Sequence, residues 1–315
     1  MSFLLKNIKE ITQNAQVNLY AVYYGYRSKK DNKCVALPED VNQMMREGLC
    51  KSLFKYQDYT ASAYDPFVTQ KDSYYLVPSK DVEGTYQDIM ALMRNAEEYK
   101  YGMNNHVINS ANLLVCELLY KNKKFLLFSR IGNTTEKILK NKVIIVYHPD
   151  ALKECKKDDL FIVSTDVDCA LEVPSDTGTE NEVDSNILVF NKNNFDKAFN
   201  YSEVQKEIVA KKIQLVEKWD FLDSNKIILD KKEQKNVYQH LAKVFADEGY
   251  LKQIETIEPG ILKSRIITMC KGKYKFSEKD FRDNKLIVTE TNLKDVMKML
   301  SKHFKFNFFS GSAEL

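Results

Sequence analysis

The chain has 315 residues, of which 44% are apolar and 29% are charged, with 47 Lys and Arg against 44 Asp and Glu. This length suffices for two domains with separate cores, and the composition excludes a collagen-like or largely disordered chain. No apolar run approaches the roughly 20 residues that cross a bilayer. The six cysteines lack CxxC spacing and the four histidines are scattered. We therefore expect reduced thiols in a cytoplasmic protein without a zinc site.

The charge is divided unevenly between the two parts of the chain. Residues 1–190 carry 23 Lys and Arg against 26 Asp and Glu, a net charge of −3, whereas residues 191–315 carry 24 against 18, a net charge of +6. A local excess of positive charge favours a polyanionic partner such as nucleic acid. Of the 24 cations, 22 are lysines, which favours sequence-tolerant contacts with phosphates over reading of the bases.

The first part of the chain predicts a mixture of helices and strands. Helices are expected over 2–14, 38–54 and 82–100, and strands over 17–26, 34–37, 74–77, 143–147 and 160–163. A hairpin is expected over 111–120 and 125–131, with the basic turn Lys121–Lys124 between its strands. Residues 56–78 carry five tyrosines without a clear period. They indicate a structured loop, which either packs on its own rings or contacts a partner.

The second part of the chain is expected to be richer in helix. The acidic stretch 172–184 indicates an interdomain loop. Helices are expected over 193–201, from Ser202 to about 219, and over 231–247, 259–270 and 292–302, with strands over 187–190, 227–229, 285–289 and 304–309. The predicted fold class is α+β. A mixed-sheet domain over 1–185 makes partner contacts, and a basic, helix-rich α/β-mixed domain over 186–315 binds DNA.

The densest basic element is Lys271-Gly-Lys273-Tyr-Lys275-Phe276. In an extended chain its three lysines share one face about 7 Å apart, and Tyr274 and Phe276 share the other. That spacing suits a phosphate backbone, although lysines on a solvated strand edge also prevent aggregation. Other lysines and an arginine are added from the neighbouring helices. The predicted DNA-binding set is Lys211, Lys212, Lys263, Arg265, Lys271, Lys273 and Lys275.

The helix that carries Lys211 and Lys212 has an alternative interpretation. Glu203 and Glu207 lie within one or two turns of Lys211 and partly neutralise its face. This neutralisation favours a solvated helix surface over a groove-binding helix for these two lysines.

An enzyme is the first rival to a DNA-binding protein. Asp150, Glu154 and Lys156 superficially follow a nuclease pattern, but that chemistry takes its acidic residues from separate elements, and these are too close in sequence. Asp166 and Asp168 flank one valine and could share a strand face. No glycine-rich nucleotide-binding motif is present. We expect no catalytic residues, metal or cofactor; an interaction scaffold without DNA binding is the second rival.

Three segments of the second part resemble a known family. They are Ile187-Leu-Val-Phe-Asn-Lys-Asn-Asn-Phe195 with Phe199 and Tyr201, the long helix after them, and Lys285-Leu-Ile-Val with Val296-Met-Lys-Met-Leu300. They resemble the C-terminal domain of protein B of the Kiwa anti-phage defence system over about 187–315. The resemblance implies a dimeric DNA-binding effector that obstructs replication or transcription of phage DNA. It also implies an integral membrane partner, Kiwa protein A, which holds the effector at the inner membrane.

Overall fold

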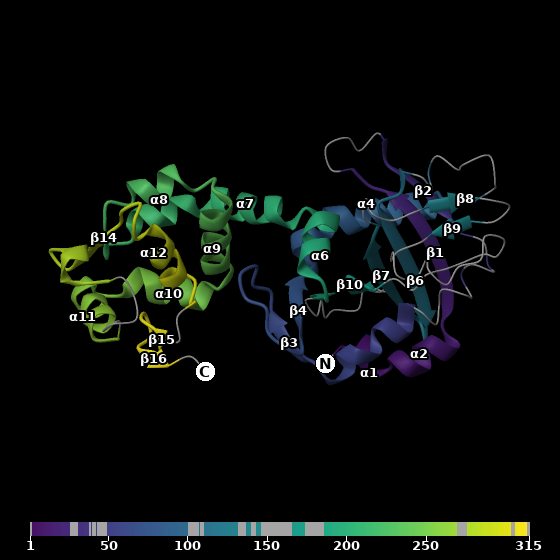
Figure 1. The fold of residues 1–315 in the computed structure, drawn as a ribbon, viewed down its shortest axis with the longest axis horizontal. Coiled ribbons are helices and arrows are strands. Elements are labelled where there is room, and N and C mark those ends of the chain that lie inside the picture. Colours follow the sequence, from purple (N-terminus) through teal and green to yellow (C-terminus); the bar gives the residue numbers. More distant parts are fainter. Residues whose placement is uncertain are drawn as a thin grey trace. The chain divides into compact units, whose positions relative to one another are not determined.

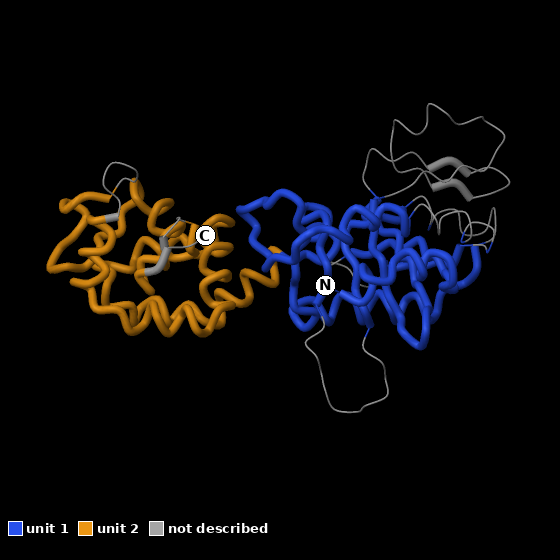
Figure 2. The backbone as a smooth tube through the Cα atoms, turned by 90° about the horizontal axis from the view of Figure 1, so that it is seen from below, with its two compact units in different colours: residues 1–201 blue, residues 202–315 orange. Residues whose placement is uncertain are grey.

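The computed structural model describes residues 2–25, 31–37, 39, 42, 49–99, 107, 110–131, 137–139, 143–145, 166–173, 186–269, 276–303 and 306–313. The chain forms two compact units, Met1–Tyr201 and Ser202–Leu315, which are coloured separately in Figure 2. The first unit is built on a sheet and the second is mainly helical (Figure 1). This arrangement confirms the predicted α+β class.

The described part of the first unit contains a nine-stranded mixed sheet in the order β3-β4-β11-β10-β7-β6-β1-β2-β5. Its strands are β1 (Gln16–Tyr23), β2 (Lys33–Ala36), β3 (Thr60–Ala63), β4 (Ser73–Pro78), β5 (Glu97–Glu98), β6 (Leu113–Tyr120), β7 (Lys123–Arg130), β10 (Cys169–Val173) and β11 (Asn186–Val189). The two strands at the edges pair in parallel and the inner pairs are antiparallel. A separate pair, β8 (Lys137–Leu139) and β9 (Val143–Ile145), is also antiparallel. The predicted hairpin over 111–131 is confirmed as β6 and β7.

Helices cover both faces of this sheet, which explains why β6 is apolar along nearly its whole length. The helices are α1 (Phe3–Lys6), α2 (Ile8–Asn14), α4 (Glu83–Arg94) and α6 (Lys192–Phe199), with 3-10 helices at Phe54–Asp58 and Ser79–Val82. On one face, α1 and α2 bury Leu5 and Ile8 in a core that includes Phe125 of β7. On the other face, the ring of Phe199 lies 5.1 Å from that of Phe128.

The boundary between the units lies later than the predicted one at residue 185. The strands on either side of residues 174–185, β10 and β11, pair with each other, so the acidic stretch joins two neighbours in one sheet. Asn191 caps α6 by accepting a hydrogen bond from the Asn194 backbone, and Phe195 and Phe199 are buried. Residues 187–315 therefore belong to both units.

The second unit packs helices around small pairs of strands. Its helices are α7 (Tyr201–Lys212), α8 (Lys226–Asp230), α9 (Lys235–Ala246), α10 (Glu248–Thr256), α11 (Pro259–Met269) and α12 (Leu293–Leu300), with 3-10 helices at Ile213–Lys218 and Glu278–Asp280. Its strands are β12 (Leu222–Asp223), β13 (Phe281–Arg282), β14 (Lys285–Ile287), β15 (Phe306–Asn307) and β16 (Ser312–Ala313). The buried core of this unit includes Trp219, Phe245, Ile266 and Leu300. No helix in the part of the chain that the structure describes is long and apolar enough to cross a membrane.

Some local predictions were wrong, for identifiable reasons. Residues 227–229 were expected as a strand but belong to helix α8, because three successive apolar residues fit either period. The long helix from Ser202 changes to a 3-10 helix at Ile213. The predicted helix at 2–14 is divided at Asn7, where one helix ends and the next begins.

Candidate nucleic-acid interface

The positive charge of the second unit is concentrated in one short segment. Residues 202–315 carry 22 Lys and Arg against 17 Asp and Glu, a net charge of +5, and Lys271, Lys273 and Lys275 supply three of these charges. These three lysines lie outside the described residues. The chain is anchored on both sides, because Ile266 and Phe276 are buried.

The chain leaves this segment through a defined turn. The Ser277 backbone donates a hydrogen bond to Oδ2 of Asp280 at 2.7 Å, and the Ser277 hydroxyl lies 3.0 Å from the same oxygen. The Ser277 side chain also accepts a hydrogen bond from the Asp280 backbone, which completes a capping box for the 3-10 helix that follows. The second anchor of the basic segment is therefore fixed by both burial and hydrogen bonds.

Lys263 and Arg265 lie on α11 but face different parts of the unit. Residues two positions apart on an α-helix point in directions that differ by about 200°. Nζ of Lys263 lies 3.0 Å from a carboxylate oxygen of Glu278 and 5.7 Å from the ring centroid of Phe281. The structure does not place the two predicted cations on a common surface.

Arg265 fastens the C-terminal hairpin. Its Nη1 donates hydrogen bonds to the carbonyl oxygens of Phe308 at 2.9 Å and Phe309 at 2.7 Å. Gly311 has a φ of +75°, and a Cβ there would lie 3.1 Å from the guanidinium, so only glycine fits this close approach. This arginine has a clear structural role, and its role in DNA binding stays a prediction.

Lys211 and Lys212 lie on α7, which is at the opposite end of the second unit from α11 (Figure 1). Lys211 is exposed. Nζ of Lys212 donates a hydrogen bond to the Phe245 carbonyl at 2.9 Å, in the last turn of α9, where a cation satisfies a terminal carbonyl. The two predicted pairs, on α7 and α11, are therefore not brought together.

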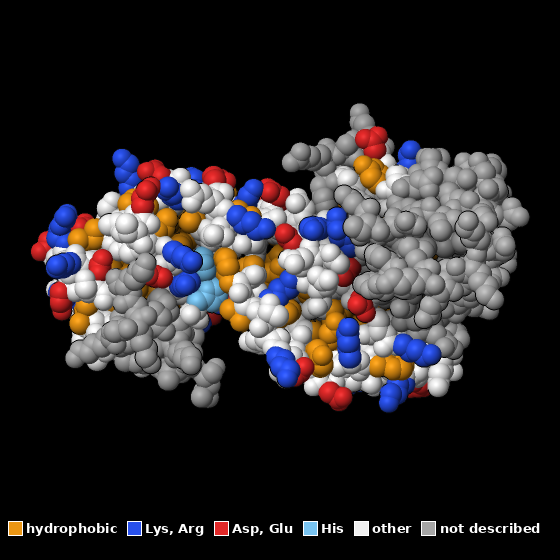
Figure 3. All heavy atoms as spheres, viewed as in Figure 1, with side chains coloured by type: hydrophobic (Ala, Val, Ile, Leu, Met, Phe, Trp, Pro, Cys, Tyr) orange, Lys and Arg blue, Asp and Glu red, His pale blue; other side chains and the backbone are white. Residues whose placement is uncertain are grey.

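A second basic group was missed by the sequence analysis. Lys294, Lys298 and Lys302 follow each other at intervals of four residues along α12 and its C-terminal turn. This spacing is readable in the sequence and places Lys294 and Lys298 on one helix face. His303 adjoins them, with its Nε2 3.2 Å from Nζ of Lys243 on α9. Figure 3 shows imidazole atoms of the described histidines at the surface with Lys or Arg side chains beside them.

A buried serine connects this group to the core. The Ser301 hydroxyl lies 2.6 Å from Nδ1 of His240, 3.2 Å from Nδ1 of His303 and 2.8 Å from the Met297 carbonyl. One consistent assignment has both imidazoles donating to the serine oxygen, which donates to the carbonyl. Ser301 is 1% exposed. It therefore positions α9 against the end of α12 and is not placed to attack a substrate.

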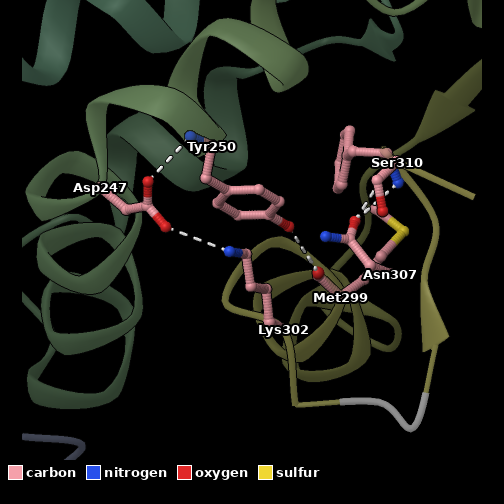
Figure 4. A network of polar contacts seen from close by, with 7 residues as sticks. Asp247, Tyr250, Met299, Lys302, Asn307 and Ser310 are labelled. Atoms are coloured by element: carbon pink, nitrogen blue, oxygen red, sulfur yellow. Dashed lines mark hydrogen bonds and ion pairs between the residues drawn. The ribbon is translucent and has the colours of Figure 1, made fainter. Parts of the chain in front are cut away.

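A further polar network holds Lys302, at the C-terminal end of this group (Figure 4). Asp247 accepts a hydrogen bond from the Tyr250 backbone at 2.9 Å and forms an ion pair with Lys302 at 3.1 Å. Nζ of Lys302 also lies 4.0 Å from the Tyr250 ring centroid. The side chain of Asn307 accepts hydrogen bonds from the backbones of Phe309 and Ser310. These contacts fix the positions from which the basic side chains project.

The acidic residues considered for a nuclease do not converge where they are described. Asp150 and Glu154 lie outside the described residues. Asp166 has a side chain that is 77% exposed and lies 3.7 Å from Lys55. Asp168 is buried and accepts hydrogen bonds from the Arg130 backbone at 2.6 Å and the Asn194 amide at 2.8 Å. No group of three or more His, Cys, Asp or Glu within the described ranges could hold a metal ion.

Comparisons with known proteins do not assign the chain to a family. No family model, no curated protein and no solved structure matches it.

Proposed function

We propose that the protein is a DNA-binding effector of bacterial anti-phage defence. It occupies phage DNA without cutting it and thereby obstructs replication or transcription. The observation that carries this proposal is the placement of three net positive charges within residues 271–275, between two buried anchors. An anchored basic segment loses less conformational freedom on binding than a free tail does. Lysine ammonium groups contact phosphates as point charges.

The cellular context of the proposal comes from the resemblance to Kiwa protein B. We propose a cytoplasmic protein that lies peripheral to the inner membrane because an integral partner, Kiwa protein A, holds it there. A homodimer would present two basic segments to one DNA molecule and increase avidity without a new kind of contact. Lys211, Lys212, Lys263 and Arg265 remain candidates for additional phosphate contacts.

A salt titration of DNA affinity tests the proposal. The triple variant Lys271→Gln, Lys273→Gln and Lys275→Gln should reduce the slope of log K against log[salt] by about 2.7, because each lost phosphate contact contributes about 0.9. A matched control replaces Lys218, Lys226 and Lys252, which are exposed lysines of the same unit, with Gln. The control carries the same change in charge and should keep most of the wild-type slope.

The same experiment separates the rival functions. An interaction scaffold shows no DNA binding even at low salt, and equal slopes for the triple variant and its control contradict the proposed segment. A nuclease shortens the DNA during prolonged incubation with Mg²⁺ or Mn²⁺. Cleavage that disappears in Asp150→Ala would establish the enzyme instead of the effector proposed here.

A further inference from the structure

A small polar cavity lies at one end of the sheet in the first unit. It has a volume of about 50 Å³ and is lined by Tyr24, Asn112, Leu113, Arg130, Lys197 and Ala198. The topology brings these residues together. β6 lies between β1 and β7 and is antiparallel to both, so the start of β6 meets the ends of its two neighbours. The last turn of α6 contributes Lys197 and Ala198.

The walls of the cavity are held by hydrogen bonds within the fold. Asn112 accepts a hydrogen bond from the Tyr24 backbone at 3.0 Å and donates one to the Tyr24 carbonyl at 2.8 Å. Its own carbonyl accepts from the Ile131 backbone at 2.8 Å. The Arg130 backbone is fixed by Asp168 at 2.6 Å. A site with walls fixed in this way needs little reorganisation when a ligand binds.

The two cations of the cavity differ from the lysines at the turn between β6 and β7. Lys121, Lys123 and Lys124 each form an ion pair with a glutamate. Neither Arg130 nor Lys197 forms an ion pair with a carboxylate within the described residues. Arg130 is half-buried, and Lys197 is exposed at the rim. Both residues line the same polar cavity, where a guanidinium can supply planar, forked donors and an ammonium a point charge.

We propose that this cavity is an anion site that binds a single phosphate group between Arg130 and Lys197. A water molecule occupies about 10–15 Å³ of such a volume, so the cavity holds a tetrahedral oxyanion but not a nucleoside. The rest of a phosphorylated ligand remains outside. The phosphate comes either from free inorganic phosphate or from a phosphorylated end of a nucleic acid. The site belongs to the first unit and does not depend on the DNA-binding segment of the second.

Two carboxylates lie near the cavity and limit its positive potential. Asp88 accepts a hydrogen bond from the Tyr24 hydroxyl at 3.0 Å. Asp168 lies behind the Arg130 backbone, is buried, and interacts electrostatically with the guanidinium. Burial raises the pKa of Asp168 to about 6, against the effect of its hydrogen bonds. Protonation of this carboxyl below pH 6 removes a negative charge from beside Arg130, while a phosphate monoester loses part of its own negative charge over the same range.

Calorimetric titration of the full-length protein tests the proposal. Sodium phosphate at low ionic strength is compared with sodium chloride at matched ionic strength. Arg130→Gln and Lys197→Gln should each weaken phosphate binding by at least about tenfold, since each removes charge-assisted hydrogen bonds. Arg94→Gln and Lys9→Gln replace exposed cations of the same unit and should stay within about twofold of the wild type. Lys197 is exposed, so its variant should keep the fold.

A second titration identifies the source of the phosphate. One oligonucleotide is offered with a 5′-phosphate and with a 5′-hydroxyl. A preference for the phosphorylated form that disappears in Lys197→Gln supports recognition of a nucleic-acid end, whereas binding of inorganic phosphate alone supports a free ion. The proposal is overturned if neither ligand binds, if both oligonucleotides bind equally without phosphate binding, or if the controls lose as much affinity as the site variants. The triple lysine variant of residues 271–275 should leave phosphate binding unchanged even if the DNA-binding proposal fails.

Discussion

Arg130 in the first unit and Arg265 in the second are the same residue type in opposite situations. Arg130 lines a polar cavity, and Asp168 accepts a hydrogen bond from its backbone and interacts electrostatically with its side chain. The guanidinium of Arg265 donates to the carbonyls of Phe308 and Phe309, both of which are buried. We propose that the first binds a ligand, whereas the second stabilises the core of its unit through these two hydrogen bonds.

The same contrast separates Lys197 from Lys212. Lys197 is exposed at the rim of the cavity, whereas Lys212 donates a hydrogen bond to the last turn of α9. The prediction from local charge density included Arg265 and Lys212. It did not include Arg130 or Lys197. A cation can bind a ligand only with donors that the fold has not already used. The acceptors that surround a cation therefore indicate whether it can bind a ligand better than the number of charges in its segment does.

Removing the guanidinium of Arg265 should give the largest effect on stability. Arg265→Met leaves two buried carbonyls without a charged donor, and we expect the free energy of unfolding of the second unit to fall by about 2–4 kcal/mol. Urea denaturation measures this change. Arg282→Met is the control, because that arginine is exposed and its ion pair with Asp223 contributes at most about 1 kcal/mol. Equal losses in the two variants would contradict the structural role of Arg265.

The buried carboxyl of Asp168 should make stability depend on pH in an unusual direction. Its pKa is raised to about 6, chiefly by burial. Near pH 5 the carboxyl is therefore protonated in the native state and ionised in the unfolded state. This contribution to stability is complete below the unfolded pKa and is lost as pH rises through 6. Asp168→Asn imitates the protonated carboxyl. Relative to wild type, it should gain up to about 3 kcal/mol between pH 4 and pH 8, measured by urea denaturation.

Asp247 in the second unit provides the control with the opposite sign. Burial alone would raise its pKa, but the hydrogen bond from the Tyr250 backbone and the contact with Lys302 outweigh burial and lower it. The stability that this carboxylate contributes is present above its unfolded pKa and is lost as pH falls. Asp247→Asn should therefore lose stability relative to wild type as pH rises. Parallel pH profiles for wild type and Asp168→Asn would show that the pKa of Asp168 is not raised.

The sequence predicted those elements whose pattern is local. The hairpin of β6 and β7 carries two apolar strands around a polar turn, and α12 shows a clear helical period, so both were found. β3 and β10 were missed because their stability comes from pairing with strands that lie elsewhere in the sequence. The domain boundary was misplaced for the same reason. An acidic stretch rich in turn-forming residues does not reveal whether the segments on either side of it pair within one sheet.

The candidate sites show the same limit. The charge of residues 271–275 is visible in the sequence, as is the spacing of Lys294 and Lys298, because each depends on neighbours along the chain. The cavity at Arg130 combines the end of β7, the start of β6 and the last turn of α6. Residues 112, 130 and 197 carry no common motif. The register of β6 and β7 and the packing of α6 against β7 bring them together.

Two matching turns offer the smallest and most local test of the comparison between units. Lys121 and Asn122 connect β6 to β7, and Asp283 and Asn284 connect β13 to β14; all four residues have positive φ. Glycine adopts such angles without the steric cost of a Cβ, and the second position of such two-residue turns favours it. Asn122→Gly and Asn284→Gly should each stabilise by at most about 0.5 kcal/mol, because the greater freedom of glycine in the unfolded chain partly offsets the relief of strain. If the two units unfold in separate steps, calorimetry should show each substitution raising the melting temperature of its own unit only. A shift of both transitions by one substitution would show instead that the units unfold together.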